Sequence, residues 1–310
     1  MKPSEAFILI QKITSNNHSD WMHNLMEIIA ITNKLLSDRA RRFSTFNDER
    51  THISNLLLQK IVLHGSSILN CGGGINFPLD LSSDFKIMDP FSLNVLMRSL
   101  LECYTTLYHI NFAPTEMEND IRFKIWTQYG LSQRARMTFT TLSKEDLKQL
   151  DDEKEQIEIL KKDILHSEIF QNLNLDKQDA LMKQIARDWK VVFKNKTYTK
   201  CSWQDLLNNT GIQQMLFNDT YNFLSWFAHS SSISLYQLRD IYRDNLVENE
   251  TKNILKEATI FIAFAITDYI KTESETKKEY DNLSMDKKNL INIYNYFYRS
   301  ELFCIDFKKE

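Results

Sequence analysis

Apolar residues recur along much of the chain at the three- and four-residue spacing of an α-helix. Ile53, Leu57 and Ile61 give one example, in which every fourth residue faces the same side. Four intervals are apolar enough to form the core of a bundle: about 50–70, 90–111, 213–235 and 250–272. Because helices that are apolar on all sides lie at the centre of a bundle, with amphipathic helices around them, the pattern predicts an all-α multi-helix bundle. We expect it to form a single helical domain over residues 1–310.

Special residues mark where two of these core helices begin and end. Asp89 precedes Pro90, a pair that favours a helix start, because the carboxylate caps free N–H groups and proline fits the first helical position. The run Gly72-Gly73-Gly74 ends the preceding helix, since glycine is the usual residue just past a helix end. It does not indicate a phosphate-binding loop, because no Lys-Ser or Lys-Thr follows it and the pattern before it is helical.

The stretch of about 113–211, between the second and third core helices, has a different character. From Leu142 to Asp163 acidic and basic residues alternate, with sparse Leu and Ile between them. That pattern is typical of a solvated helix, which would form one half of an antiparallel arm. We therefore expect a helical insertion between the core helices at 90–111 and 213–235.

The composition favours a soluble helical protein. Six Gly and four Pro among 310 residues leave few turns. The four cysteines lie far apart, and we expect them to be reduced thiols of a cytoplasmic protein. The best membrane candidate, Ala258 to Ile270, is too short for a span and includes Asp268, so we expect a buried helix and no membrane partner. A formal net charge of -3 gives no general attraction to nucleic acid, so that partner would need a local basic patch.

Two polar pairs lie within the apolar core helices. Arg98 and Glu102 are four residues apart in one helix, and Ser225 and His229 are four residues apart in another, so each pair shares a helix face. Charged groups are rarely buried without a partner. If the two helices are neighbours, the four side chains form one polar cluster. The cluster either fixes the register of the helices as a structural network or lines a functional site, and the residues alone leave both interpretations open.

The segments that hold these pairs are LMRSLLECYTTLYHI (Leu96–Ile110) and YNFLSWFAHSSS (Tyr221–Ser232). They resemble a family of uncharacterised bacterial helical proteins with an Arg-x-x-x-Glu helix and a later Ser-x-x-x-His helix. That family is loosely similar to the HEPN superfamily, helical bundles that include many metal-independent ribonucleases of toxin and antiphage systems. The resemblance covers the core helices only. It implies that His229 moves a proton at the ribose hydroxyl or the leaving group, while Arg98 stabilises charge on the phosphoryl oxygens.

The spacing of Arg and His departs from the usual HEPN motif, in which both lie close together on one helix. The first His after Arg98 is His109, eleven residues later, which is about 16 Å along the helix axis. Arg98 can therefore act only with His229, across the bundle or across a dimer interface. In this hypothesis Glu102 and Ser225 orient the two catalytic residues, although Glu102 also pairs with the cation that would bind the phosphate.

A basic segment from Lys183 to Lys200 holds six basic residues and one acid, with Trp189 and Tyr198 among them. Its cations could contact a nucleic-acid backbone while the two aromatic rings stack on bases; the alternative is a solvated face whose aromatic rings point inward. The candidate nucleic-acid-binding residues are Lys183, Arg187, Lys190, Lys194 and Lys196. A second basic group precedes the charged helix and consists of Arg122, Lys124, Arg134 and Arg136. No metal-ligand, nucleotide or cofactor motif is visible, so we expect no metal and no cofactor.

Two functional hypotheses of different classes follow. The first is a HEPN-like effector of bacterial defence or toxin type, a metal-independent endoribonuclease with Arg98 and His229 as catalytic residues. The second is a non-catalytic binding module, in which the cluster is structural and the basic arm docks a protein, a second copy of the chain or a nucleic acid. The two differ in exposure, because a site needs a cleft that reaches Arg98 and His229, whereas a register-fixing network is closed to solvent.

Overall fold

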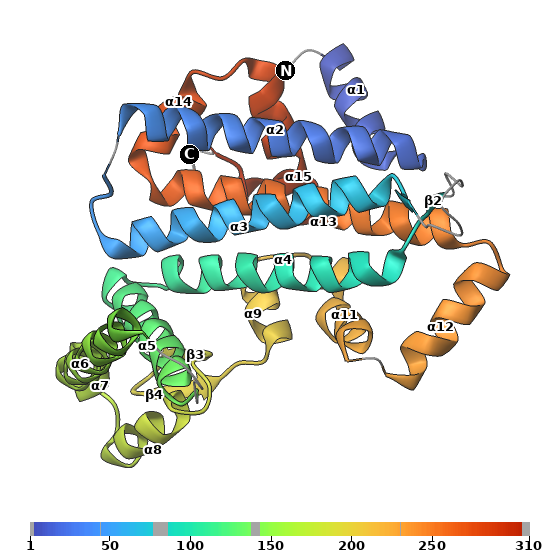
Figure 1. The fold of residues 1–310 in the computed structure, drawn as a ribbon. Coiled ribbons are helices and arrows are strands. Elements are labelled where there is room, and N and C mark those ends of the chain that lie inside the picture. Colours follow the sequence, from blue (N-terminus) through green and yellow to red (C-terminus); the bar gives the residue numbers. More distant parts are fainter. Residues whose placement is uncertain (1–2, 44, 77–85, 138–142, 230, 306–310) are drawn as a thin grey trace. The chain divides into compact units, whose positions relative to one another are not determined.

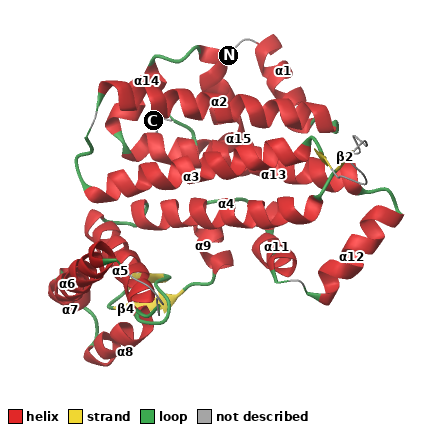
Figure 2. Ribbon diagram, viewed as in Figure 1, coloured by secondary structure: helices red, strands yellow, loops and turns green. Residues whose placement is uncertain are grey.

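The computed structural model of the chain is shown in Figure 1 and describes residues 3–43, 45–76, 86–137, 143–229 and 231–305. Nearly all of the regular structure is α-helix, and the strands form two small antiparallel pairs (Figure 2). This confirms the all-α prediction. The contacts divide the chain into two compact units, where a single domain was expected: the first is Met1–Tyr108 with Leu207–Glu310, and the second is His109–Leu206.

The first unit is built around long helices. It contains α1 (Pro3–Thr14), α2 (His18–Arg42), α3 (Glu49–Gly72), β1 (Ile75–Asn76), β2 (Lys86–Ile87), most of α4 (Pro90–Asn111), α10 (Gln214–Phe217), α11 (Thr220–Ala228), α12 (Ser232–Arg243), α13 (Val247–Thr272), α14 (Ser274–Asp281), α15 (Met285–Tyr298) and a short 3-10 helix (Glu301–Phe303). Helix α13 packs against α2, α3 and α15 (Figure 1).

Helix α13 is central because its C-terminal half is apolar on almost every side. Each residue from Ala258 to Ile270 is buried. The ring of Tyr104 in α4 packs at a tilt against Phe261 and Phe264, with ring centroids 5.8 and 6.1 Å away. Among the described residues no helix combines the length and the apolar character that crossing a membrane requires. The expectation that 258–270 forms a buried helix is therefore confirmed.

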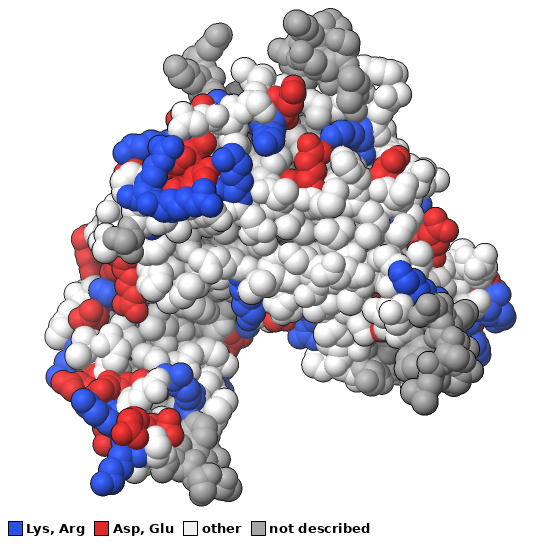
Figure 3. All heavy atoms as spheres, turned by 45° about the horizontal axis from the view of Figure 1, so that its top comes forward, with Lys and Arg blue, Asp and Glu red and all other residues white. Residues whose placement is uncertain are grey.

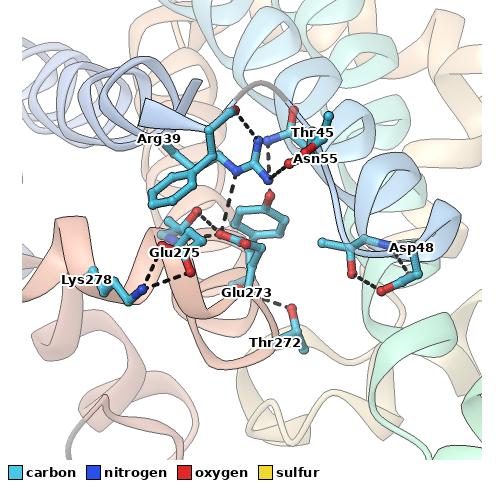
Figure 4. A network of polar contacts seen from close by, with 12 residues as sticks. Arg39, Thr45, Asp48, Asn55, Thr272, Glu273, Glu275 and Lys278 are labelled. Atoms are coloured by element: carbon cyan, nitrogen blue, oxygen red, sulfur yellow. Dashed lines mark hydrogen bonds and ion pairs between the residues drawn. The ribbon is translucent and has the colours of Figure 1, made fainter. Parts of the chain in front are cut away.

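Two buried ion pairs hold the helices of this unit in register. Asp268, the acid within the apolar run of α13, accepts from Arg299 Nη1 at 2.9 Å and from the Tyr104 hydroxyl at 3.1 Å. In the second pair, Arg39 Nε lies 3.9 Å from Glu273, and the guanidinium also donates to the carbonyls of Phe43 and Thr45 (Figure 4). These side chains are at most 4% exposed. Removing one partner from such a pair would leave an uncompensated charge, so both are structural.

The predicted helix boundaries at α3 and α4 agree with the structure. The Asp89 carboxylate accepts from the backbone N–H groups of Phe91 and Ser92 at 3.0 and 3.1 Å, which is the expected N-terminal cap. Helix α3 ends at Gly72, and Gly74 has a φ of 87°, a conformation that glycine adopts without strain.

The interval 213–235, expected as one core helix, forms three shorter helices instead: α10, α11 and α12. The backbone leaves the helical path at Asp219, whose φ is 58°, and the side chain of Ser231 caps the start of α12. Polar residues that favour caps and turns therefore interrupt an apolar stretch that periodicity alone makes continuous. Most of α12 is exposed, so it is not a core helix.

The second unit has its own core. It contains α5 (Glu116–Ala135), α6 (Lys144–His166), α7 (Glu168–Gln171), α8 (Leu175–Ile185), β3 (Val191–Lys194), β4 (Thr197–Lys200) and the start of α9 (Trp203–Asn209). Helices α5 and α6 are antiparallel, because Lys124 pairs with Asp163 and the later Arg134 pairs with the earlier Glu153. Strands β3 and β4 join through Asn195 and Lys196, both with positive φ, as a tight hairpin requires.

Candidate functional site

Helices α4 and α11 bring Arg98 and His229 into direct contact. Arg98 Nη1 lies 3.1 Å from His229 Nε2, although the two residues are 131 positions apart in the chain. Arg98 Nε donates to Glu102 Oε1 at 2.9 Å, one turn along α4. Arg98 Nη2 donates to the Tyr221 hydroxyl at 2.8 Å, and that hydroxyl donates to Glu102 Oε1 at 2.9 Å. Arg98, Glu102, Tyr221 and His229 form what we call the Arg98 cluster.

Helical periodicity positions the two α11 residues of the cluster. Tyr221 and His229 are eight residues apart, so both lie on the side of α11 that contacts Arg98. His229 is the residue at the C-terminal end of the helix, and its side chain is exposed. Sequence reasoning missed Tyr221. The signal that could have found it was the spacing of Tyr221, Ser225 and His229, each four residues after the last.

Ser225 does not belong to the cluster. Its hydroxyl donates to the backbone carbonyl of Tyr221 at 2.8 Å, one turn earlier in its own helix. A serine within a helix commonly makes this bond, which satisfies the hydroxyl locally. The structure therefore brings together three of the four predicted catalytic residues, Arg98, Glu102 and His229, and adds Tyr221 in place of Ser225.

Hydrogen-bond chemistry assigns the protonation state of the cluster in this arrangement. Arginine carries only donors, so His229 Nε2 accepts from Arg98, which requires a neutral imidazole with its proton on Nδ1. Burial and the hydrogen bond to Glu102 raise the pKa of Tyr221 to about 12, so its hydroxyl stays protonated at neutral pH. The cluster thus holds one guanidinium, one carboxylate, one neutral imidazole and one phenol close together.

The Arg98 cluster is open to solvent, unlike the other two Arg–carboxylate pairs described above. The side chains of Arg98 and Glu102 are 19% and 30% exposed, and His229 is an exposed residue. The Arg299–Asp268 and Arg39–Glu273 pairs are almost completely enclosed. Three hydrogen bonds occupy three of the five N–H groups that a guanidinium carries, and within the described residues the other two have no acceptor, so a ligand could bind them.

His109, the first histidine after Arg98, has a structural position in the second unit. It is 3% exposed and lies edge-on to Trp189, with ring centroids 5.4 Å apart. Burial, together with the charges of Arg122 and Lys190, lowers its pKa well below the usual value, so the imidazole is neutral. His109 is therefore enclosed among side chains and is not positioned to meet a substrate.

The five predicted nucleic-acid-binding residues differ in their exposure to solvent and in their ion pairing. Lys183, Arg187, Lys194 and Lys196 are exposed. The Lys190 ammonium instead donates to Asp188 at 2.7 Å and lies over the Trp203 ring. Four of the five cations could therefore contact an anion.

The aromatic residues of this segment do not form a base-stacking platform. Trp189 is buried in the core of the second unit and packs edge-on against Trp203, so the prediction that it stacks on bases is wrong. Tyr198 packs against the same core and is half-buried. The alternative interpretation, with cations in solvent and rings pointing inward, therefore describes the segment. Aromatic rings bury a large apolar area, and this burial stabilises the small core of the second unit.

The second basic group is largely neutralised. Arg122 pairs with Glu118, Lys124 with Asp120 and Asp163, and Arg134 with Glu153, while Arg136 reaches the Ala186 carbonyl at 3.5 Å. Basic and acidic side chains also adjoin one another on the face of the molecule in Figure 3. In the described residues no group of three or more His, Cys, Asp or Glu is placed to hold a metal ion. Comparison of the chain with known proteins finds no matching family model, no matching curated protein and no matching solved structure.

Proposed function

We propose that the chain is a metal-independent endoribonuclease whose active site is the Arg98 cluster. The observation that carries this proposal is the exposure of the cluster: a guanidinium and a neutral imidazole in contact with each other at the surface, where a register-fixing network would be enclosed. The resemblance to HEPN-like proteins of bacterial defence and toxin systems points in the same direction.

The cluster contains the groups that RNA transesterification needs. Substrate enters by displacing the contact between Arg98 Nη1 and His229 Nε2. The freed Nε2 takes the proton of a ribose 2′-hydroxyl while the 2′-oxygen forms a bond to phosphorus and the bond from phosphorus to the 5′-oxygen breaks. The imidazolium returns the proton to the leaving 5′-oxygen. The products are a 2′,3′-cyclic phosphate and a free 5′-hydroxyl, and no metal ion takes part.

Arg98 stabilises the charge that develops on the non-bridging phosphoryl oxygens. Glu102 and Tyr221 hold two of its nitrogens, which fixes the plane of the guanidinium before substrate arrives. Preorganised donors of this kind lower the barrier because they need no reorientation during the reaction. Glu102 and Tyr221 are therefore positioning residues in this scheme, and Arg98 and His229 are the catalytic residues.

The exposed cations of the second unit, Lys183, Arg187, Lys194 and Lys196, would add contacts to further phosphates of a bound RNA. Their contribution should weaken as salt concentration rises, because neutralised phosphates release counterions. If the chain binds RNA but does not cleave it, these four residues are the basis of the second candidate function, a non-catalytic nucleic-acid-binding module.

The test is incubation of the purified chain with end-labelled RNA in a chelator-containing buffer, beside His229→Ala and Arg98→Ala. We expect cleavage that leaves cyclic phosphate ends and falls at least about 100-fold in both variants. DNA of the same sequence should stay intact, since it has no 2′-hydroxyl. His23→Ala, which removes an exposed histidine from α2, is the matched control and should cleave like wild type. Cleavage that survives His229→Ala in a folded protein would contradict the assignment.

A further inference from the structure

A second feature of the first unit is a pocket between α4, the α10–α11 connection and α13. Its volume is about 570 Å³, within the range of small-molecule sites. Glu250 and Glu257, seven residues apart on α13, lie on the same side of that helix and line the pocket. Asp219 adds a third carboxylate from the start of α11, and Phe223 and Trp226 provide aromatic wall. Asn94 of α4 also lines the pocket.

The carboxylates of Glu250 and Glu257 have no ion-pair or hydrogen-bond partner among the described residues. Burial raises the pKa values of Glu250 and Glu257. The charges of the nearby Lys252 and Lys256 oppose this rise, but neither lysine forms an ion pair with these carboxylates among the described residues. Lys252 donates to the side chains of Asn16 and Asn249, and Lys256 lies over the rings of Trp21 and Tyr298. Two unpaired carboxylates in one concave site repel each other and lose part of their hydration, which a bound cation would relieve.

Asn94 adds a fixed polar group to the pocket. The residue is 4% exposed, and its side-chain nitrogen donates to the Pro90 carbonyl at 2.8 Å, which fixes the orientation of the carboxamide. The residue lines the pocket, and among the described residues no side chain or backbone group donates to its carboxamide oxygen. That oxygen is therefore available to accept a hydrogen bond from a ligand in the pocket. The carboxylates and this carboxamide oxygen make the pocket a site rich in acceptors.

We propose that this pocket binds a small organic cation, whose ammonium or guanidinium N–H groups donate to Glu250, Glu257 and the Asn94 oxygen. Trp226 and Phe223 lie against its apolar part and can add cation–π attraction. An anionic ligand such as a nucleotide would be repelled by the three carboxylates. The proposal depends on the pocket alone and is independent of the ribonuclease proposal, since none of these residues belongs to the Arg98 cluster.

The pocket nevertheless lies close to that cluster along the chain. Asn94 precedes Arg98 by one turn of α4. Phe223 and Trp226 lie on α11, between Tyr221 and His229 in the sequence. A cation bound there would contact the two helices that hold the catalytic pair.

Calorimetric titration with spermidine and with agmatine tests the proposal, in about 0.15 M salt to screen attraction to the net negative surface. We expect saturable binding at one site for at least one of these amines and none for 1,6-hexanediol, an uncharged molecule of similar length. Glu257→Gln and Glu250→Gln should each weaken binding at least about tenfold, since each loses a charged hydrogen bond. The matched control is Glu248→Gln, which removes the same charge from an exposed position on α13 and should change affinity less than about twofold.

Absence of saturable binding with both amines would overturn the proposal. So would an equal loss of affinity in Glu248→Gln and Glu257→Gln, because the amines would then follow the overall charge and not the pocket. Thermal melts of each variant, run beside the titrations, show whether a loss of binding accompanies a loss of fold. The titrations contain no RNA, so their outcome is separate from that of the cleavage assay.

Discussion

Replacing Glu257 by Gln should stabilise the protein at alkaline pH, although the substitution removes a proposed ligand contact. Burial, opposed by Lys256 and reinforced by the charge of Glu250, raises the pKa of Glu257 to about 7, from an ordinary value of 4.5. Below about pH 4.5 the carboxyl is protonated in both the folded and the unfolded chain. As pH rises from there to about 7, the unfolded chain loses this proton first, so stability falls; above about 7 the loss is constant.

The difference of about 2.5 between the two pKa values corresponds to a ceiling of about 3 kcal/mol, at about 1.4 kcal/mol for each pH unit. Solvent reaches the half-buried side chain through the open pocket, so we expect about 1–2 kcal/mol. Gln has nearly the same shape as Glu and cannot ionise, so the variant should not lose this stability as pH rises.

Urea unfolding of wild type and Glu257→Gln at pH 5 and pH 8 measures this effect. The variant should have the higher free energy of unfolding at pH 8, and the two proteins should nearly coincide at pH 5. Glu248→Gln, the exposed control on the same helix, should match wild type at both pH values. A Glu257→Gln variant that is no more stable than wild type at pH 8 would refute the reasoning. It would mean that the carboxylate is compensated in the folded protein and that the pocket does not need a cation.

Three further outcomes can be checked with the same methods. Asp268→Asn should lower the free energy of unfolding by about 3–5 kcal/mol in urea, because it leaves the Arg299 charge buried without its carboxylate. Trp189→Ala should cost about 3–5 kcal/mol, seen as an earlier loss of near-ultraviolet circular dichroism, since it empties the centre of the second unit's core; a cost below about 1 kcal/mol would mean that the ring is not enclosed. Ser225→Ala should change RNA cleavage less than about twofold, because the hydroxyl donates to the Tyr221 carbonyl of its own helix; a loss as large as that of His229→Ala would mean that Ser225 takes part in the reaction.

Local sequence signals were sufficient to predict the positions of the long helices. The segment of α13 from Ala258 to Ile270 is apolar on almost every side and could be stable only in a core, so its position followed from its composition. The boundaries of α3 and α4 were also predictable, since Gly74 supplies a left-handed residue and Asp89 supplies acceptors for free N–H groups. These signals act over a few residues and need no partner from elsewhere in the chain.

Periodicity failed where local polar interactions compete with helix propagation. The interval 213–235 has the composition of one apolar helix, but it is divided at Asp219 and again before Ser231. The hairpin of β3 and β4 was missed because its turn, Asn195-Lys196, lacks the glycine that usually marks such turns. The sequence left two positions open for Trp189, on the surface or pointing inward, because its neighbours in sequence are basic; in the structure its neighbours in space are apolar.

The sequence by itself determined that this protein is helical, where α3, α4 and α13 lie, and that Arg98 and His229 each needed a partner. Only the tertiary structure decided which partner each one has. Arg98 contacts Tyr221 and His229 across more than 120 residues of chain, and Asn94 lines one pocket with Glu250 and Glu257 across an even longer interval. Helical periodicity defines the face on which a side chain lies, but which faces meet depends on packing among distant helices. The exposure of the Arg98 cluster and the unpaired acceptors of the pocket are consequences of that packing.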